Sequence, residues 1–478
     1  MKFCTDENIK IIEDYINKHR DEILSDLMTL VRIPSIKADR VADKPYGHAC
    51  AKALEASKNL FDENGFETKI NTEYGYALAY YGNKQAKSIG IFSHSDVVPV
   101  GGEWLMCEPF EPVIRDGHVF GRGCNDNKSG VITALYAAKM IKDLGFNLKN
   151  RLVMFVGSNE ETGMKDIDAF SRIEKMPDAS LVPDAEYPCI SGEKSMIDFD
   201  ITSKKPLESI KKFCGGKAFN IILDDVDAEL VYNEKLYEEI KALISQDNRF
   251  KVKVNENTIF INAKGISKHA AYPEGSVNAA VILADMLCKC DLLCQNDKNI
   301  LADLSRLVTD YYGAGFGIQH EDCVFGKLTS ANGIVSMTED NCLNAVFNLR
   351  FGTSCDFDVT SQKIKKAVEN VWNISEIKGS QGYNIEDDSV VLKATEEVYR
   401  YISGDADAKA EKCSGGTYAR HIKNALPVGT VAPYKLKNLN LPDGHGDVHQ
   451  PDESLSIEAF FESIKIVTCM IMEIDSVL

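Results

Sequence analysis

The sequence predicts an α/β protein in which a mixed, largely parallel sheet is flanked by helices and an α+β domain is inserted into the chain. Short apolar runs alternate with amphipathic helical patterns up to Leu181, which is typical of βαβ units. This alternating pattern changes after Pro188 and returns near Ile385. We therefore expect a first domain made of residues 1–190 and 385–478, interrupted by an inserted domain of residues 191–384.

The first domain opens with helical spacing of isoleucine and leucine across residues 6–31, and Pro34 follows. Further helices are predicted at 49–63, 128–144 and 165–174, and strands at 67–70, 76–81, 88–92, 151–156 and 181–182. Ligands of such sheets gather at the carboxyl ends of the strands. His94, Glu160, Glu161 and Asp184 stand at those ends.

The inserted domain shows alternating strands and amphipathic helices without a metal-type cluster. Its predicted strands are 196–201, 220–223, 258–263 and 343–351, and its predicted helices are 230–244, 277–287, 299–311 and 359–371. The pattern of the first domain then returns, with a predicted helix at 389–402, a strand at 428–431 and a last helix that follows Pro451 and ends near Ile474.

Composition limits the partners and the compartment. The chain has 478 residues, enough for a large core, and 54 basic against 72 acidic residues give a net charge of −18. This charge argues against nucleic acid or an anionic membrane as a partner. The first residues show no signal-peptide pattern, and no apolar stretch approaches 18 residues. We expect a cytoplasmic protein.

The fourteen cysteines form no Cys-x-x-Cys pair and read as reduced thiols. Cys288, Cys290 and Cys294 lie in one helical pattern over residues 277–294. A metal site is one reading of this group, but ordinary core or surface thiols are favoured, because the spacing does not place three sulfurs on one helix face.

The turn at residues 121–130, Gly-Arg-Gly-Cys-Asn-Asp-Asn-Lys-Ser-Gly, places Asp126 just before a predicted helix. A carboxylate in this position either caps the helix or is held rigidly for chemistry. Capping is the commoner use of such a residue. The neighbouring strand ends, with His94 and the Glu160-Glu161 pair, favour the second use.

Histidine and carboxylate ligands suit zinc, cobalt or manganese. Two ions about 3.5–4 Å apart need a bridging carboxylate, for which Asp126 is the candidate. In His94-Ser95-Asp96 the period-two spacing lets Asp96 accept a hydrogen bond from the imidazole. One of Glu160 and Glu161 could bind metal while the other holds a water. Taken singly, such acidic pairs are usually solvated caps.

Six motifs in order carry a resemblance to a known family. They are Ser-His-Ser-Asp-Val-Val-Pro (93–99), Trp104 with Pro109-Phe110, Gly-Arg-Gly-Cys-Asn-Asp (121–126), Asn-Glu-Glu-Thr (159–162), Pro-Asp-Ala-Glu-Tyr-Pro (183–188) and Val-His-Gln-Pro-Asp-Glu (448–453). This series resembles the di-zinc metallopeptidases, which include carnosinases, aminoacylases, carboxypeptidase G, acetylornithine deacetylase and succinyl-diaminopimelate desuccinylase. The likeness is greatest to PepV-type dipeptidases and covers nearly the whole chain.

The resemblance implies two divalent metal ions, zinc first and cobalt or manganese as alternatives. His94, Asp126 and Asp184 would hold one ion, and Asp126, Glu161 and His449 the other. Glu160 falls at the general base and Asp96 at the residue that orients the first histidine. His445 rivals His449 on spacing alone, but only His449 stands in the final motif.

The resemblance also makes residues 1–190 and 385–478 a catalytic domain and the insert a lid. His269, in Gly-Ile-Ser-Lys-His-Ala-Ala (265–271), takes the role of stabilising the oxyanion. Arg350 either pairs with a substrate carboxylate or forms a structural ion pair. Gly415, Gly416 and Thr417 match a glycine turn near the substrate carboxyl group.

The function implied is metal-dependent hydrolysis of the amide bond of dipeptides, by a water that two metal ions activate and from which Glu160 takes the proton. Asp184 and Glu186 would attract a free amino end. The alternatives are an N-acyl amino-acid deacylase on the same core and a metal-binding protein without catalysis. The large insert implies a monomer. The branch generally reads Asp-Asp-Lys-Gly after the arginine-glycine turn, whereas Asn127 and Ser129 stand here.

Overall fold

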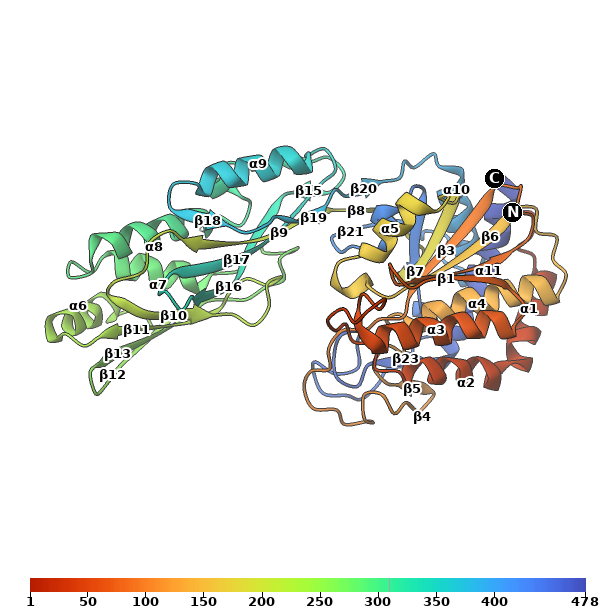
Figure 1. Ribbon diagram of the computed structural model, residues 1–478, viewed down its shortest axis with the longest axis horizontal. Coiled ribbons are helices and arrows are strands. Elements are labelled where there is room, and N and C mark those ends of the chain that lie inside the picture. Colours follow the sequence, from red (N-terminus) through yellow and green to blue (C-terminus); the bar gives the residue numbers. More distant parts are fainter. Residues whose placement is uncertain (309) are drawn as a thin grey trace. The chain divides into compact units, whose positions relative to one another are not determined.

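The computed structural model describes residues 1–308 and 310–478 and divides into two compact units (Figure 1). Unit 1 contains Met1–Gly192 and Ile385–Leu478, and unit 2 contains Glu193–Asn384. The predicted fold class is confirmed, because unit 1 packs helices on a mixed sheet and unit 2 is an α+β body.

The helices of unit 1 are α1 Asp6–Lys18, α2 Arg20–Val31, α3 Gly47–Glu63, α4 Lys128–Asp143, α5 Lys165–Ile173, α10 Val390–Ser403 and α11 Ile457–Val477, with the short 3₁₀ turns η1 Glu160–Thr162, η3 Tyr418–His421 and η4 Pro433–Lys435. Its strands are β1 Glu67–Asn71, β2 Tyr76–Tyr81, β3 Ser88–His94, β4 Val113–Arg115, β5 His118–Phe120, β6 Arg151–Gly157, β7 Ala179–Ala185, β8 Ile190–Glu193, β21 Glu411–Cys413, β22 Ala425–Gly429 and β23 Ser454–Ser456.

The main sheet of unit 1 has the order β1-β2-β6-β3-β7-β22 in the described part of the chain. Strands β6, β3, β7 and β22 are parallel, and β2 and β1 add an antiparallel hairpin at the edge. The carboxyl ends of β3, β6 and β7 therefore meet at one edge of the sheet.

Alternation along the strands gives the sheet two apolar faces. Ile91 and Met154 belong to the core that includes α4 and α11, whereas Phe92 and Phe155 point to the opposite face. There they pack against Phe170 of α5, with ring centroids 5.4 and 5.2 Å away. Both faces are covered, so the strand ends are the part of the sheet left for polar groups.

Unit 2 has its own core beneath an antiparallel sheet whose order is β12-β13-β11-β10-β16-β17-β9-β18, with β19 beside β9. Its strands are β9 Ser195–Ser203, β10 Ile210–Gly215, β11 Asp225–Val231, β12 Phe250–Asn255, β13 Thr258–Lys264, β14 Glu321–Asp322, β15 Gly326–Lys327, β16 Thr329–Met337, β17 Leu343–Phe351, β18 Trp372–Ile374, β19 Lys378–Ser380 and β20 Tyr383–Asn384. Its helices are α6 Glu234–Ile244, α7 Ala279–Cys288, α8 Gln295–Val308 and α9 Phe357–Val368, with the short turn η2 Ala314–Phe316.

Several predicted elements were wrong in extent. The single helical run 6–31 is two helices that break at His19. The predicted strand 220–223 forms only one bridge, because Ile222 N donates to Lys268 O while Leu223 N donates to Asn332 O on a different segment. The predicted helix 230–244 starts at Glu234, since Leu230 and Val231 pair in β11 and Asn233 caps the helix.

The helical pattern 277–294 ends at Cys288, and α8 begins at Gln295, so Cys288, Cys290 and Cys294 share no helix. They form no metal-type group among the described residues. The predicted helix 299–311 lies within α8 up to Val308, and its position 309 falls outside the described residues.

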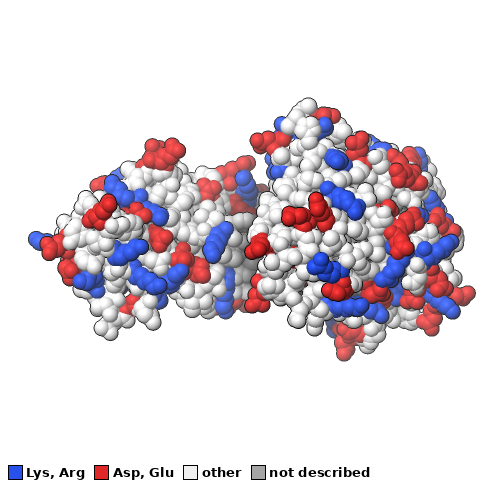
Figure 2. Space-filling view, turned by 90° about the horizontal axis from the view of Figure 1, so that it is seen from below, with Lys and Arg blue, Asp and Glu red and all other residues white. Residues whose placement is uncertain are grey.

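The surface carries both signs of charge. On the visible face of each unit, acidic and basic side chains are interspersed rather than gathered in one basic area (Figure 2). Helices with both the length and the apolar character needed to cross a bilayer are absent from the described part of the chain.

Candidate metal centre

The five predicted metal ligands meet at the carboxyl edge of the unit 1 sheet. His94 ends β3, Asp184 lies near the end of β7, and Glu161 lies in the η1 turn just beyond β6. Asp126 stands on the turn before α4, and His449 on the loop before β23. These residues form two groups, in each of which one ligand atom per residue lies within 4.8 Å of the others.

The first group joins His94, Asp126 and Asp184. His94 Nε2 lies 3.2 Å from Asp126 Oδ1 and 3.6 Å from Asp184 Oδ2. The histidine side chain is almost fully buried, and the two carboxylates are only slightly exposed.

The second group joins Asp126, Glu161 and His449. His449 Nε2 lies 2.8 Å from Asp126 Oδ2 and 3.3 Å from Glu161 Oε2. Each oxygen of Asp126 thus faces a different histidine, which is the arrangement that a carboxylate bridging two ions requires.

The donor set fits two divalent ions. Ligand atoms about 2 Å from a tetrahedral zinc ion lie about 3.3 Å apart, close to the separations given above. His94 Nε2 and Glu161 Oε1 are buried without a hydrogen-bond partner, and buried polar atoms are rarely left so. Imidazole and carboxylate are ligands that zinc, cobalt and manganese accept.

The charges of this centre shift its pKa values. Burial opposes ionisation of Asp126, but the neighbouring His449 and His94 hold the pKa of Asp126 below its usual value. The hydrogen bonds to Asp126 and Glu161 raise the pKa of His449 to about 11. Burial lowers the pKa of His94, yet Asp184, Asp126 and Asp96 raise it well above its usual value.

Burial raises the pKa of Glu160 well above its usual value; His94 opposes the rise, and Asp184 and Glu161 add to it. Bound cations would counter the effect of the neighbouring carboxylates. Glu160 lies beside both ligand groups and belongs to neither. Glu160 is therefore a carboxylate of this centre that is not needed as a ligand in either group.

Comparison with known proteins identifies the family. A model described as "Peptidase family M20/M25/M40" matches residues 90–473. The chain belongs to this peptidase family. It is 27% identical over 470 residues to the Bacillus subtilis (strain 168) protein named "Putative dipeptidase YtjP", with 96% of this chain and 98% of that protein covered.

Solved structures of family M20 proteins and their kin share the fold. Human carnosine dipeptidase 1 aligns over 98% of this chain and 99% of its own, with a TM-score of 0.60 and 13% identity. The dipeptidase Dug1p from Saccharomyces cerevisiae aligns over 99% of both chains, with a TM-score of 0.60 and 13% identity. The expected resemblance is confirmed at the level of the family and of dipeptidase relatives.

Asp96 has a wider role in this M20 chain than the His-x-Asp spacing suggested. Its backbone oxygen is the closer partner of His94 Nδ1, at 3.0 Å, against 3.4 Å for its carboxylate. The carboxylate accepts from the backbone N–H groups of Glu160 and Glu161, both at 3.2 Å. Asp96 therefore holds the η1 turn as well as the imidazole.

Glu453 was missed as a site residue, although it ends the final motif. Its Oε2 accepts from Arg122 Nη1 at 2.8 Å and Gly123 N at 2.9 Å, and its Oε1 from the backbone N–H groups of Asn125 and Asp126, both at 3.0 Å. Glu453 is fully buried. It ties the loop of His449 to the turn that presents Asp126.

The loop of His449 is strained and firmly held. His449 and Asp452 adopt left-handed backbone angles, φ 64° and 56°, which non-glycine residues seldom accept. Asp452 Oδ1 accepts from Leu105 N and Met106 N at 2.8 Å, and Asp452 Oδ2 lies 2.6 Å from His445 Nδ1. His445 thus braces the loop and stands in neither ligand group.

The glycine turn lies in unit 1 between β21 and η3. Arg420 Nη2 donates to Gly415 O at 3.0 Å, and a Cβ on Gly416 would collide with the Arg420 guanidinium. Thr417 Oγ1 accepts from Ala419 N at 3.1 Å. The next residue, Tyr418, was also missed: its ring stacks edge-on with that of His94 at 6.3 Å.

The two predicted lid residues lie together in unit 2. Arg350, on β17, is buried and donates through Nε to Asn348 Oδ1 at 3.1 Å. Burial and the charge of Arg350 lower the pKa of His269. Because His269 Nδ1 accepts from Ala271 N at 3.2 Å, a neutral His269 carries its proton on Nε2 and can donate from there.

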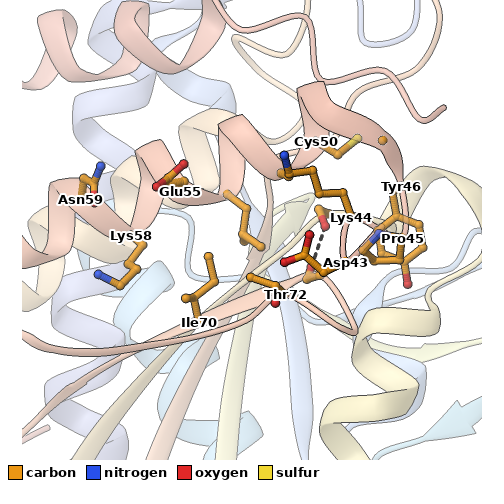
Figure 3. Close-up of a pocket in the computed structure, with 15 residues that line it drawn as sticks. Asp43, Lys44, Pro45, Tyr46, Cys50, Glu55, Lys58, Asn59, Ile70 and Thr72 are labelled. Carbon is orange, nitrogen blue, oxygen red and sulfur yellow. Dashed lines mark hydrogen bonds between the residues drawn. The ribbon is translucent and has the colours of Figure 1, made fainter. Parts of the chain in front are cut away.

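A separate pocket of about 450 Å³ lies between α3 and β1 (Figure 3). Lys44, Tyr46 and Cys50 line it from the loop and the start of the helix, and Ile70 and Thr72 from the strand side. None of its lining residues belongs to either ligand group. The pocket is therefore separate from the candidate metal centre at the strand ends.

Proposed function

We propose that this chain is a metal-dependent dipeptidase that hydrolyses the amide bond of dipeptides with a free amino end. The observation that carries the proposal is the position of Asp126, whose two oxygens face His94 and His449 in adjacent ligand groups. Membership of the M20 family and its dipeptidase relatives support peptide hydrolysis.

His94, Asp126 and Asp184 would hold one ion, and Asp126, Glu161 and His449 the other, with zinc as the proposed metal. When bound, the two ions supply Lewis acidity, which lowers the pKa of a water molecule and polarises the amide carbonyl. Glu160 takes the proton of the attacking water and returns it to the leaving amine. Asp96 keeps Glu160 in place through the backbone of the η1 turn.

The remaining residues position the substrate. Asp184 and Glu186 attract its ammonium group, and the glycine turn of Gly415, Gly416 and Thr417 lies near its carboxylate. Arg350 is proposed as an ion-pair partner of the same carboxylate. His269 donates from Nε2 to the carbonyl oxygen as that oxygen gains charge. We propose a cytoplasmic monomer, and fourteen scattered cysteines without a Cys-x-x-Cys pair agree with a reducing compartment.

The test replaces Glu160 by glutamine. Glu160→Gln should lower kcat on dipeptides by about 10²- to 10⁴-fold, because general acid–base catalysis contributes that much. The variant should still bind two metal ions, as metal analysis of the same sample would show. The matched control is Glu55→Gln on α3, an exposed glutamate outside both ligand groups, which should keep wild-type turnover.

Dipeptides should be assayed beside N-acetyl amino acids. Turnover of the acyl amino acids alone would replace the dipeptidase by a deacylase on the same centre. Metal binding by a wild-type protein that cleaves neither substrate would mark a metal-binding protein without catalysis. Full activity of Glu160→Gln would remove the proposed base.

A further inference from the structure

Asn127 follows the bridging carboxylate, and its side chain is fully buried. Asparagine is a favoured helix cap, and Asn127 occupies the cap position of α4, yet its side chain makes no capping hydrogen bond. Its backbone oxygen already accepts from Gly130 N at 2.9 Å. The amide is therefore directed elsewhere, toward the ends of β3 and β7.

The amide makes three contacts at the first ligand group. Asn127 Oδ1 accepts from His94 N at 3.3 Å. Asn127 Nδ2 donates to Asp184 Oδ1 at 2.9 Å and to Pro183 O at 2.5 Å. The partners settle the orientation of the amide, since a backbone N–H can only donate and the two oxygens can only accept.

Only a side chain that both donates and accepts can satisfy these partners. An ionised aspartate at position 127 would set a second acceptor against Asp184 Oδ1 and Pro183 O. The hydrogen bond to Asp184 Oδ1 leaves Oδ2, the oxygen nearer His94 Nε2, turned toward the ligand group. Gly130 provides the space, because a Cβ there would lie 2.3 Å from Asn127 Oδ1.

We propose that Asn127 is the positioning residue of the first metal group, which fixes Asp184 and the His94 backbone relative to each other through one neutral amide. This inference rests on the metal centre of the proposed function. The asparagine that stands here in place of the expected aspartate would then have a defined role in the metal centre of this chain. The second group should not depend on the Asn127 amide, whose hydrogen bonds go to His94, Pro183 and Asp184 rather than to Glu161 or His449.

Cobalt binding to metal-free protein tests this role without any assay of activity. Co²⁺ is titrated against a competing chelator and followed by visible absorption. The Glu161→Ala background keeps only the first group intact, and Asp184→Ala keeps only the second. In the Glu161→Ala background, Asn127→Ala should weaken Co²⁺ binding by about 10- to 100-fold, the usual effect of removing a hydrogen-bond partner of a ligand. In the Asp184→Ala background, Asn127→Ala should leave the Co²⁺ affinity unchanged.

Two further variants separate positioning from folding. Asn127→Leu keeps the volume without the hydrogen bonds and should weaken the first group as Asn127→Ala does. Asn150→Ala removes another buried asparagine, whose Nδ2 donates to Asp475 O at 3.2 Å at the opposite end of β6. It should leave both Co²⁺ affinities unchanged. Urea unfolding of the metal-free variants reports any loss of stability. If Asn127→Ala does not fold, the Co²⁺ affinity of Asn127→Leu tests the proposal instead.

The proposal fails if Asn127→Leu binds Co²⁺ like the wild type or if Asn127→Ala has no effect in the Glu161→Ala background. It also fails if Asn127→Ala lowers the Co²⁺ affinity equally in both backgrounds. It also fails if the wild type binds no Co²⁺, and the proposed function then fails with it. The two are otherwise distinguishable. The expected binding pattern in a protein that does not cleave dipeptides would refute only the function, and dipeptide cleavage with unchanged Asn127→Ala binding would refute only this role.

Discussion

At the scale of single residues, protons and metal ions compete for the same ligand atoms of the candidate centre. His449 Nε2 lies 2.8 Å from Asp126 Oδ2, and its pKa of about 11 keeps the imidazole protonated at neutral pH. The pair stabilises the metal-free fold fully below the ordinary histidine pKa of 6.5, and that contribution is lost as the pH rises toward 11.

Metal binding at neutral pH should therefore release at least one proton per chain, and metal affinity should rise with pH below about 11. The reason is that an ion needs the lone pair on His449 Nε2 that the proton occupies. Calorimetric titration of Zn²⁺ in two buffers of different ionisation enthalpy counts the protons. A heat of binding that is the same in both buffers would contradict the protonated state assigned to His449.

Glu453 and Arg122 form a buried pair, each at most 1% exposed. Glu453→Ala should lower the free energy of unfolding by about 3–5 kcal/mol, because it leaves the Arg122 guanidinium buried without its counter-charge. Urea denaturation of the metal-free protein measures this. Lys84→Ala removes an ion pair whose two side chains are more than half exposed, and it should leave the urea midpoint nearly unchanged. Equal effects of the two variants would refute this stabilising role of the Glu453–Arg122 pair.

At the scale of elements, the end of β6 is shaped by a side chain that comes from far along the chain. Tyr418 passes over Gly157 and donates to Asp166 Oδ2 at 2.6 Å, and Asp166 Oδ2 also accepts from Ser158 N and Asn159 N. Gly157 has no Cβ to obstruct this path, since one would lie 1.9 Å from the Tyr418 hydroxyl.

Gly157→Ala should therefore displace Tyr418 and lower the free energy of unfolding by about 1–3 kcal/mol, the usual cost of an overpacked site. Chemical denaturation gives the value, and the loss of the Tyr418 contact to His94 should also reduce activity on dipeptides. Gly101→Ala, where an added Cβ meets nothing within 4 Å, is the control and should behave like the wild type. A fully stable Gly157→Ala would show that Tyr418 can move at no cost.

Sequence patterns predicted the helices and strands that bury a regular apolar face. They failed where contacts with distant segments determine the backbone conformation. The apolar runs of β3 and β6 and the periodicity of α4 match the structure to within a few residues. The segment 220–223 looks like a strand, but its consecutive N–H groups bond to two different segments. In the candidate site, motif order brought out His94, Asp126 and His449. Glu453 and Tyr418 were missed, because each acts through a contact with a residue hundreds of positions away along the chain. Asp166 was missed because this buried carboxylate lies in no recognisable motif.

At the scale of the whole molecule, the two units are built differently along the chain. Unit 2 is one uninterrupted stretch with its own core, whereas unit 1 needs both ends of the chain. Helix α11 packs against α4, and β22 pairs with β7, so the first 192 residues alone lack a helix and a strand of their own core.

An isolated 193–384 fragment should accordingly fold cooperatively, since its core is complete, while an isolated 1–192 fragment should not. Urea denaturation followed by circular dichroism, with proton–nitrogen NMR spectra of both fragments, checks this. A dispersed spectrum for 1–192 and a collapsed one for 193–384 would reverse the assignment of independent stability.

The ligands also have an order in time. During synthesis, His94, Asp126 and Asp184 leave the ribosome before the insert, and His449 leaves it after the insert. A nascent chain, or one truncated by a nonsense mutation upstream of His449, contains the residues of the first ligand group but not all those of the second. The proposed two-metal centre is therefore incomplete in every copy that stops short of His449.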